Sequence, residues 1–356
     1  MCIRPAIRSE APYRFRAEPA GIKLDQNESP FDLTEPLKSR IFERLSKIPF
    51  NRYPEIHAQG LRRKIARHFE WPEDGIVVAG GSNVLVQSLV ITAGLGQKVL
   101  TVTPTFPVYA MQARLLDAQL IELPLTTGFE LPVAALEREL SSGRGVLFLA
   151  NPAAPTGNLH RRTDLLSLIE AAATDWLVVI DEAYCQFAAS DYLEVVRQHR
   201  HVVSLRTFSK AFGLGGVRLG FALTTPDVAE NVQKVMMPFA VSSLQQAVGE
   251  VMLDEIEAVT EVVEQISSER ARLWKALSRL ENITVFPSET NFLLIKVPDP
   301  ARVHRELLDR GVLIRRQDHL PGLQGCVRVT IGSIEENALF LSAFQEVVMK
   351  QDRYDE

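Results

Sequence analysis

The chain has 356 residues, a formal net charge of −5, 46% hydrophobic residues and 23% charged residues. This length fits two domains, or one large domain with a smaller partner, in a protein of ordinary globular composition. The sequence has no block of five or more basic residues, which excludes nucleic-acid binding through a phosphate-neutralising surface.

Signals for membranes, secretion and cross-linking are also missing from the sequence. No segment reaches the roughly 18 to 20 apolar residues that a membrane span needs, and the N-terminal residues lack the continuous apolar core of a secretory signal. Cys2, Cys185 and Cys326 are widely spaced, so they predict neither a disulfide framework nor a metal site. We therefore expect a cytoplasmic protein without metal, membrane or nucleic-acid partners.

The first two regions of the chain differ in their hydrophobic pattern. Residues 1–30 are rich in proline and weakly periodic, and we expect them to form an arm that packs near the C-terminal domain or a partner. Residues 31–235 alternate short apolar runs with amphipathic stretches, which predicts an α/β domain with helices on both faces of a mostly parallel sheet. The expected strands are 75–80, 98–104, 118–125, 145–152, 176–184, 201–208 and 218–224.

The pattern changes after residue 235. Residues 243–280 predict one long helix with a kink. Strands and helices then alternate without the regular spacing of the larger domain, so residues 236–356 predict a smaller α+β domain. Its expected strands are 283–297, 312–317 and 325–332, and its expected helices are 301–311 and 335–349.

Polar side chains follow three of the expected strands at the points where the strands end. In open α/β sheets, ligands collect beyond the carboxyl ends of the strands. We therefore expect one site at this edge of the sheet. The residues concerned are Gly80, Gly81, Ser82 and Asn83 after the first strand, Asp181 and Tyr184 at the fifth, and Thr207, Ser209 and Lys210 after the sixth.

Lys210 is flanked by Phe208 and Phe212, which predicts that it is partly buried. A buried lysine loses its charge readily and becomes a nucleophilic amine. The hydroxyls of Thr207 and Ser209, with Arg218, suggest an anion nearby, most simply a phosphate. A carboxylate on a buried strand, such as Asp181, is costly unless it meets a cation.

Several motifs resemble the fold-type I pyridoxal-phosphate-dependent aminotransferases over nearly the whole chain. Within that family, the segments "KLDQNESPF", "NRYPE", "SETNFLLIK" and "VLIRRQ" are most similar to the histidinol-phosphate aminotransferase branch. The resemblance implies a seven-stranded sheet sandwiched by helices, plus a smaller domain. The motifs that carry the family resemblance are "GGSN", "TPTFPVY", "PTG", "VVIDEAY", "RTFSKAFGLGGVRLGF" and "CVRVTIG".

The resemblance implies a role for each residue that matches the family's cofactor site. Lys210 matches the lysine that forms a Schiff base with pyridoxal 5'-phosphate and moves protons. Asp181 matches the partner of the pyridine nitrogen, Tyr184 the donor to the ring's phenolic oxygen, and Phe106 the aromatic residue that stacks on the ring. Tyr53 matches a residue that reaches the neighbouring subunit's cofactor phosphate, which implies a homodimer with shared active sites. The residues that match the phosphate cradle are Ser82, Asn83, Thr207, Ser209 and Arg218.

The substrate site is less closely defined by the resemblance. Arg328 matches the arginine that binds the substrate α-carboxylate. Tyr13 and Arg315 match positions near the distal phosphate of histidinol phosphate, although arm packing and a surface charge are the alternatives. Asn27 matches either the pocket lining or a turn. The implied reaction is transamination of L-histidinol phosphate with 2-oxoglutarate; the alternatives are transamination of an aromatic or other amino acid, and decarboxylation of threonine phosphate.

The sequence departs from the family pattern at two positions. Ala154, in "NPAAPTG", stands where the family has an asparagine that donates to the ring's phenolic oxygen. A lost hydrogen bond to a charged oxygen is worth about 1.5–3 kcal/mol, so we expect the proton of the lysine–cofactor imine to be held more tightly than is usual. The second departure is Val84, where the family often has an acidic residue.

Overall fold

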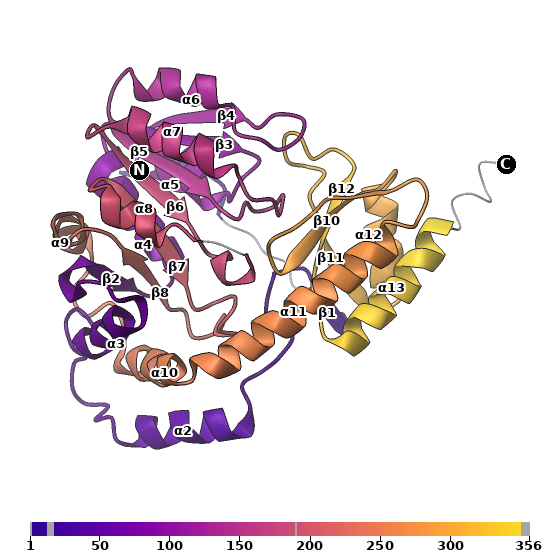
Figure 1. Cartoon of the computed structure of the whole chain (residues 1–356), viewed down its shortest axis with the longest axis horizontal. Coiled ribbons are helices and arrows are strands. Elements are labelled where there is room, and N and C mark those ends of the chain that lie inside the picture. The colour runs from indigo at the N-terminus through magenta and orange to yellow at the C-terminus, as the bar shows by residue number, and fades with distance from the viewer. Residues whose placement is uncertain (1, 13–17, 189–190, 350–356) are drawn as a thin grey trace.

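A computed structural model describes residues 2–12, 18–188 and 191–349. The larger sheet has seven strands, and each runs parallel to its neighbours except β8, which is antiparallel to β2 and β7 (Figure 1). This arrangement confirms the predicted α/β fold. In spatial order the strands are β2 (Ile76–Ala79), β8 (Gly220–Leu223), β7 (Val202–Thr207), β6 (Trp176–Asp181), β5 (Gly145–Ala150), β3 (Lys98–Thr103) and β4 (Gln119–Pro124).

Helices cover both faces of this sheet. Every residue of β5 is buried, and successive side chains point to opposite faces. Val146 and Phe148 therefore join the core beneath α4, α5 and α9, while Leu147 and Leu149 join the core beneath α3, α6, α7 and α8. These helices are α3 (Gln59–Phe69), α4 (Ser82–Leu89), α5 (Val108–Leu115), α6 (Val133–Leu140), α7 (Arg162–Ala172), α8 (Leu193–Gln198) and α9 (Pro226–Val235).

The second sheet has five strands and lies at the other end of the molecule (Figure 1). It is antiparallel except where β1 joins its edge parallel to β11. Its spatial order is β1 (Ile22–Leu24), β11 (Val312–Arg316), β12 (Cys326–Thr330), β10 (Phe292–Lys296) and β9 (Thr284–Val285). The helices beside it are α11 (Ile256–Leu277), α12 (Pro300–Leu308) and α13 (Ile334–Met349).

The long helix predicted at 243–280 is two helices in the structure. The first is α10 (Ser243–Asp254), which packs against α3 and α2 (Glu35–Ser46), and α11 then runs toward the smaller sheet. Glu255 leaves the helical region between them, with φ −115° and ψ 37°. Ion pairs from Lys64 to Asp254 and from Arg40 to Glu255 hold this break against α2 and α3. The sequence predicted a kink in this helix but not its place, because the apolar periodicity continues through the break.

The N-terminal arm contacts both domains. Its second half forms β1 in the smaller sheet, whereas α1 (Pro5–Ser9) lies near α5, with Arg4 paired to Asp117 at 2.9 Å. The domain boundary expected at residue 235 stays a prediction. The packing of α10 against helices of the larger domain favours a boundary nearer to the break at Glu255.

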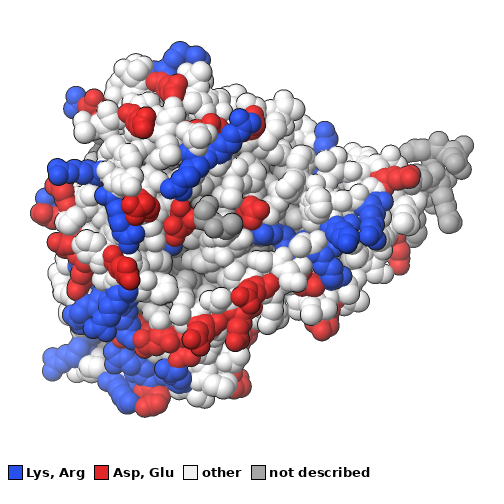
Figure 2. Space-filling view, viewed as in Figure 1, with Lys and Arg blue, Asp and Glu red and all other residues white. Residues whose placement is uncertain are grey.

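The two signs of charge are distributed unevenly over one face of the molecule. Figure 2 shows acidic side chains along α11, which carries the exposed Glu257, Glu261 and Glu264, and basic side chains over α2 and α3. Part of this basic surface is engaged by α10, because Arg44 pairs with Glu250 at 2.9 Å. Across residues 2–12, 18–188 and 191–349, no helix combines the length and apolar character needed to cross a bilayer.

Candidate active site

A pocket of about 540 Å³ lies where the carboxyl ends of β5, β6 and β7 face the smaller sheet. This volume is within the range of small-molecule sites. The predicted site residues that line it are Asn27, Ser82, Asn83, Phe106, Asp181, Tyr184, Thr207, Ser209, Lys210, Arg218, Arg315 and Arg328. The structure therefore brings together side chains from the arm, both sheets and the loop after β7.

Two predicted site residues are not among those that line the pocket. Tyr53 is 83% exposed, and its ring stacks on Phe239 with a centroid distance of 4.9 Å. Its predicted role is toward a second subunit, so exposure in a single chain agrees with that hypothesis. Tyr13 lies outside the described residues.

Lys210 is half-buried in the loop that follows β7. Phe208 and Phe212 on either side of it are buried and pack together, with ring centroids 4.6 Å apart. They hold the loop against the core while the lysine side chain reaches the pocket. Its Nζ donates to the backbone oxygens of Gln26 (3.1 Å) and Asn27 (3.0 Å) in the arm.

Asp181 ends β6 and is 6% exposed. The Tyr109 hydroxyl donates to its Oδ2 at 2.5 Å, and the backbone N–H of Ala183 donates to its Oδ1 at 3.1 Å. Burial raises the pKa of Asp181 to about 6, although both hydrogen bonds lower it. Burial also raises the pKa of Tyr109 well above its ordinary value, which keeps the phenol a donor. The pocket thus holds a carboxylate whose negative charge costs free energy to bury unless a cation binds beside it.

Asn27 connects the arm to both domains at the pocket. Its Nδ2 donates to the Tyr184 hydroxyl at 2.8 Å, and its backbone oxygen accepts from Asn291 Nδ2 at 3.1 Å as well as from Lys210. Its backbone N–H donates to Thr330 Oγ1 at 2.9 Å. Asn27 adopts φ 54°, a conformation that asparagine tolerates better than most residues. The prediction that this residue either lines a pocket or forms a turn was too narrow, because it also positions Tyr184 and Lys210.

One end of the pocket has the donors that a phosphate requires. Ser82 and Asn83 begin α4, whose N-terminal N–H groups favour an anion. Arg218 Nη1 lies 3.2 Å from Ser209 Oγ. Gly81 adopts φ 104°, a backbone conformation that side chains rarely tolerate, and it lies against the Arg218 guanidinium. A helix terminus, hydroxyls and a guanidinium form a suitable donor set for a phosphate monoester.

Two arginines lie at the other end, on the smaller sheet. Arg315 and Arg328 are directly opposite each other on β11 and β12, and both line the pocket. Arg328 Nη2 donates to the backbone oxygen of Asp25 at 2.8 Å. The neighbouring Arg316 is exposed and pairs with Asp318 at 2.7 Å. Strand alternation therefore separates a pocket arginine from a surface arginine within the pair "RR".

Sequence reasoning missed Tyr109 and the backbone of Gln26. Tyr109 lies three residues after Phe106 in "TPTFPVY", and their rings meet edge to face with centroids 5.6 Å apart. Phe106 precedes α5 and Tyr109 lies in its first turn, so their closeness in the sequence was an available signal. Ala154 does line the pocket, and its methyl group offers no hydrogen-bond donor. Nothing in the structure explains Val84.

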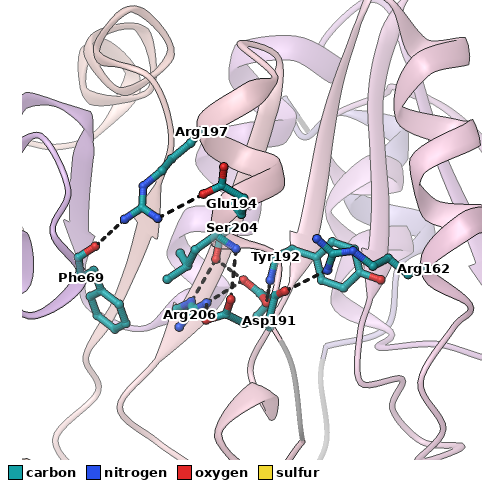
Figure 3. A network of polar contacts seen from close by, with 10 residues as sticks. Phe69, Arg162, Asp191, Tyr192, Glu194, Arg197, Ser204 and Arg206 are labelled. Atoms are coloured by element: carbon teal, nitrogen blue, oxygen red, sulfur yellow. Dashed lines mark hydrogen bonds and ion pairs between the residues drawn. The ribbon is translucent and has the colours of Figure 1, made fainter.

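A buried ion-paired network joins β7, which carries Ser204 and Arg206, to Glu182, which follows β6. Figure 3 shows Arg206 with Ser204, Asp191 and Tyr192. Arg206 Nη2 contacts Glu182 Oε2 at 3.0 Å and Asp191 Oδ2 at 2.9 Å. Ser204 donates to the same Glu182 oxygen, and the Tyr192 backbone N–H donates to Oε1 at 2.9 Å. The network ties together the two strands that carry Asp181 and the Lys210 loop.

The lysine, carboxylate and phenol beside a phosphate cradle define a site of the vitamin B6-dependent class. The family model described as "Aminotransferase class I and II" matches residues 19–344, and the chain belongs to this family of pyridoxal-phosphate-dependent enzymes. A Deinococcus radiodurans relative named histidinol-phosphate aminotransferase is 44% identical over 343 residues, which are 96% of this chain and 95% of the relative.

Solved structures agree on the fold. The histidinol-phosphate aminotransferase of Sinorhizobium meliloti, solved with pyridoxal-5'-phosphate, superposes with a TM-score of 0.86 at 24% identity and covers 98% of both chains. The L-threonine-O-3-phosphate decarboxylase of Porphyromonas gingivalis has a TM-score of 0.80 at 23% identity over 92% of this chain and 99% of that one. The fold alone therefore does not separate these two activities.

Proposed function

We propose that the chain transfers the amino group of L-histidinol phosphate to 2-oxoglutarate, as a step of histidine biosynthesis in the cytoplasm. The observation that carries the proposal is a single pocket in which Lys210, Asp181 and a phosphate cradle face two arginines from the smaller sheet. The relative at 44% identity bears the name of this activity over nearly the full length of both chains.

The residues present fit pyridoxal 5'-phosphate. Ser82, Asn83, Thr207, Ser209 and Arg218 would hold its phosphate, Phe106 would cover its ring, and Asp181 would accept the N–H of its ring nitrogen. When bound, the cofactor supplies an aldehyde that links to amines and a ring that withdraws electrons from the substrate Cα.

The chain's own groups then divide the work of proton transfer. Lys210 Nζ takes the proton from the substrate Cα and returns it, which is general acid–base catalysis by a positioned amine. The backbone oxygens of Gln26 and Asn27 direct Nζ toward the pocket. Tyr184 presents its hydroxyl proton to the pocket, because Asn27 Nδ2 already donates to the Tyr184 oxygen. Closure of the site by the smaller sheet orients the substrate and excludes water.

The paired arginines support an anionic substrate. Arg315 and Arg328 stand opposite each other on neighbouring strands, and both line the pocket. Histidinol phosphate offers a phosphate, and 2-oxoglutarate offers two carboxylates. Both proposed substrates therefore bring an anionic group that a guanidinium can bind.

A homodimer with shared sites is part of the proposal. Tyr53 lies beside a group of exposed apolar side chains that a second copy would cover. The exposed fractions are 81% for Phe50, 83% for Tyr53, 78% for Met237 and 40% for Phe239. Large exposed apolar groups of this kind mark interaction surfaces. We expect sedimentation to show a dimer, and a stable monomer that retains activity would contradict the shared site.

The test measures which amine discharges the cofactor. The purified yellow protein is mixed, without keto acid, with L-histidinol phosphate, L-glutamate, an aromatic amino acid or L-threonine phosphate, and the absorbance above 400 nm is followed. Loss of absorbance with histidinol phosphate and glutamate supports the proposal. Release of CO2 from threonine phosphate would instead support the decarboxylase, and bleaching by the aromatic amino acid but not by histidinol phosphate would overturn the substrate.

Matched variants locate the substrate anion and the cofactor. Arg315→Gln should raise the KM for histidinol phosphate about tenfold or more, since a charge-assisted hydrogen bond is worth about 1.5–3 kcal/mol. Arg316→Gln, at the exposed neighbour, should leave that KM unchanged.

Borohydride reduction followed by peptide mass analysis should find the pyridoxyl label on Lys210, and a label on another residue would overturn the site.

A further inference from the structure

We propose that Tyr109 is a positioning residue that holds the Asp181 carboxylate so that it accepts the cofactor's ring N–H. This inference rests on the proposed cofactor. Tyr109 comes from α5, Asp181 from the end of β6, and their side chains meet at the floor of the pocket that both residues line.

The geometry leaves Tyr109 little freedom. Its side chain is completely buried, and its ring lies nearly parallel to that of Phe148 on β5, with centroids 4.9 Å apart and an interplanar angle of 9°. The Phe106 ring meets it edge to face, with centroids 5.6 Å apart. The hydroxyl is thus held 2.5 Å from Asp181 Oδ2 by packing as well as by the hydrogen bond.

The two donors to Asp181 act on different oxygens. Tyr109 Oη binds Oδ2, and the Ala183 N–H binds Oδ1, so the plane of the carboxylate is fixed from both sides. A carboxylate has about four lone-pair positions, so each oxygen keeps a position for one further donor. A ring N–H entering the pocket would meet a preorganised acceptor.

A neutral donor is suited to this task, whereas a cation is not. A lysine or arginine at position 109 would neutralise Asp181 and compete with the ring nitrogen for its charge. The phenol supports the carboxylate and leaves its full charge available to the ring. Phe106, the residue expected to cover the ring, also packs against Tyr109. One aromatic side chain therefore positions two of the contacts that the cofactor requires.

The test compares two ligands on two proteins. The apoprotein is titrated with pyridoxal 5'-phosphate and with 1-deazapyridoxal 5'-phosphate, in which carbon replaces the ring nitrogen, and both dissociation constants are measured by equilibrium dialysis. The native chain should bind the natural cofactor more tightly. Tyr109→Phe should weaken binding of pyridoxal 5'-phosphate about 10- to 100-fold, the range for a hydrogen bond to a charged group, and should change binding of the deaza analogue less than threefold.

A control variant separates positioning from packing. Tyr192→Phe alters another buried tyrosine, which does not line the pocket, and should leave the ratio of the two dissociation constants unchanged. Equal losses for both ligands in Tyr109→Phe would reduce Tyr109 to a packing role and overturn the proposal, as would no loss for either. If that variant does not fold, Tyr109→His, which retains an N–H donor, should keep the preference for the natural cofactor, and loss of the preference would overturn the proposal.

The outcomes for this role and for the proposed function are distinguishable. A native chain that binds neither ligand would overturn the cofactor and the role of Tyr109 together. A native chain that prefers pyridoxal 5'-phosphate, with an unchanged preference in Tyr109→Phe, would overturn the role alone.

Discussion

Asp181 and Glu182 are adjacent in the sequence and both buried, yet they meet opposite surroundings. Arg206 contacts Glu182 at 3.0 Å, and Ser204 and the Tyr192 N–H also donate to Glu182. Asp181 faces the pocket, and the donors that it receives from the described residues are neutral, namely Tyr109 and the Ala183 N–H. Among residues 2–12, 18–188 and 191–349, a cation therefore contacts Glu182, whereas neutral groups contact Asp181.

The two carboxylates therefore contribute in different ways. Glu182 already has its cation in the folded chain, so removing that cation should lower the stability of the protein. Burial raises the pKa of Asp181 to about 6, which means that its charged form destabilises the empty protein at neutral pH. A ligand with a positive N–H relieves that cost, and part of the binding free energy comes from doing so.

Removing the cation that pairs with Glu182 should have the largest effect on stability. Arg206→Met leaves Glu182 buried without its cation and should lower the free energy of unfolding by about 3–5 kcal/mol. Urea denaturation of the cofactor-free protein measures this loss. The double variant Arg206→Met with Glu182→Gln should recover most of the loss. A loss below about 1 kcal/mol in the single variant would show that water or another group compensates the charge.

Neutralising Asp181 should instead raise the free energy of unfolding. The pKa of Asp181 is about 6 in the folded protein and 3.8 ordinarily, so the folded state favours the neutral carboxyl. The contribution of this group to stability is therefore fully present below its ordinary pKa, and it is lost as the pH rises through the folded pKa. Asp181→Asn should therefore stabilise the cofactor-free protein at pH 7.5 by about 3 kcal/mol, with no difference near pH 3.5. The measurement is unfolding free energy across this pH range. Identical pH profiles for the two proteins would contradict the assignment.

A hydrogen-bond donor added to the pocket should have a smaller effect, on the titration of the bound cofactor. Ala154→Asn restores a side chain able to bind the cofactor's phenolic oxygen, and one hydrogen bond to a charged oxygen is worth about 1.5–3 kcal/mol. The midpoint of the yellow absorbance change with pH should fall by about one unit. An unchanged midpoint would mean that Tyr184 and solvent already satisfy this oxygen.

The exposed end of the Arg206 network should respond least. The Asp191 side chain is 40% exposed, whereas that of Glu182 is fully buried. Solvent screens a half-exposed pair, so Asp191→Asn should cost less than about 1 kcal/mol of unfolding free energy. A loss as large as that of Arg206→Met would show that Asp191 shares fully in neutralising the arginine.

The sequence predicted the parts of the site that depend on local pattern. Buried strands of β-branched residues place Asp181 and Thr207 at strand ends, and parallel strands bring those ends together. It did not predict the contact between Asn27 and Tyr184, which are 157 residues apart. It predicted a kink in the long helix but not where it falls, because α10 packs against α2 and α3, which lie far away in the sequence.

Asn27 connects the reactive amine to both domains. One residue of the arm binds Tyr184 and Lys210 on the larger domain and Asn291 and Thr330 on the smaller one. The place of the lysine amine is therefore determined by contacts with both sheets, and not by the strand that carries its loop alone.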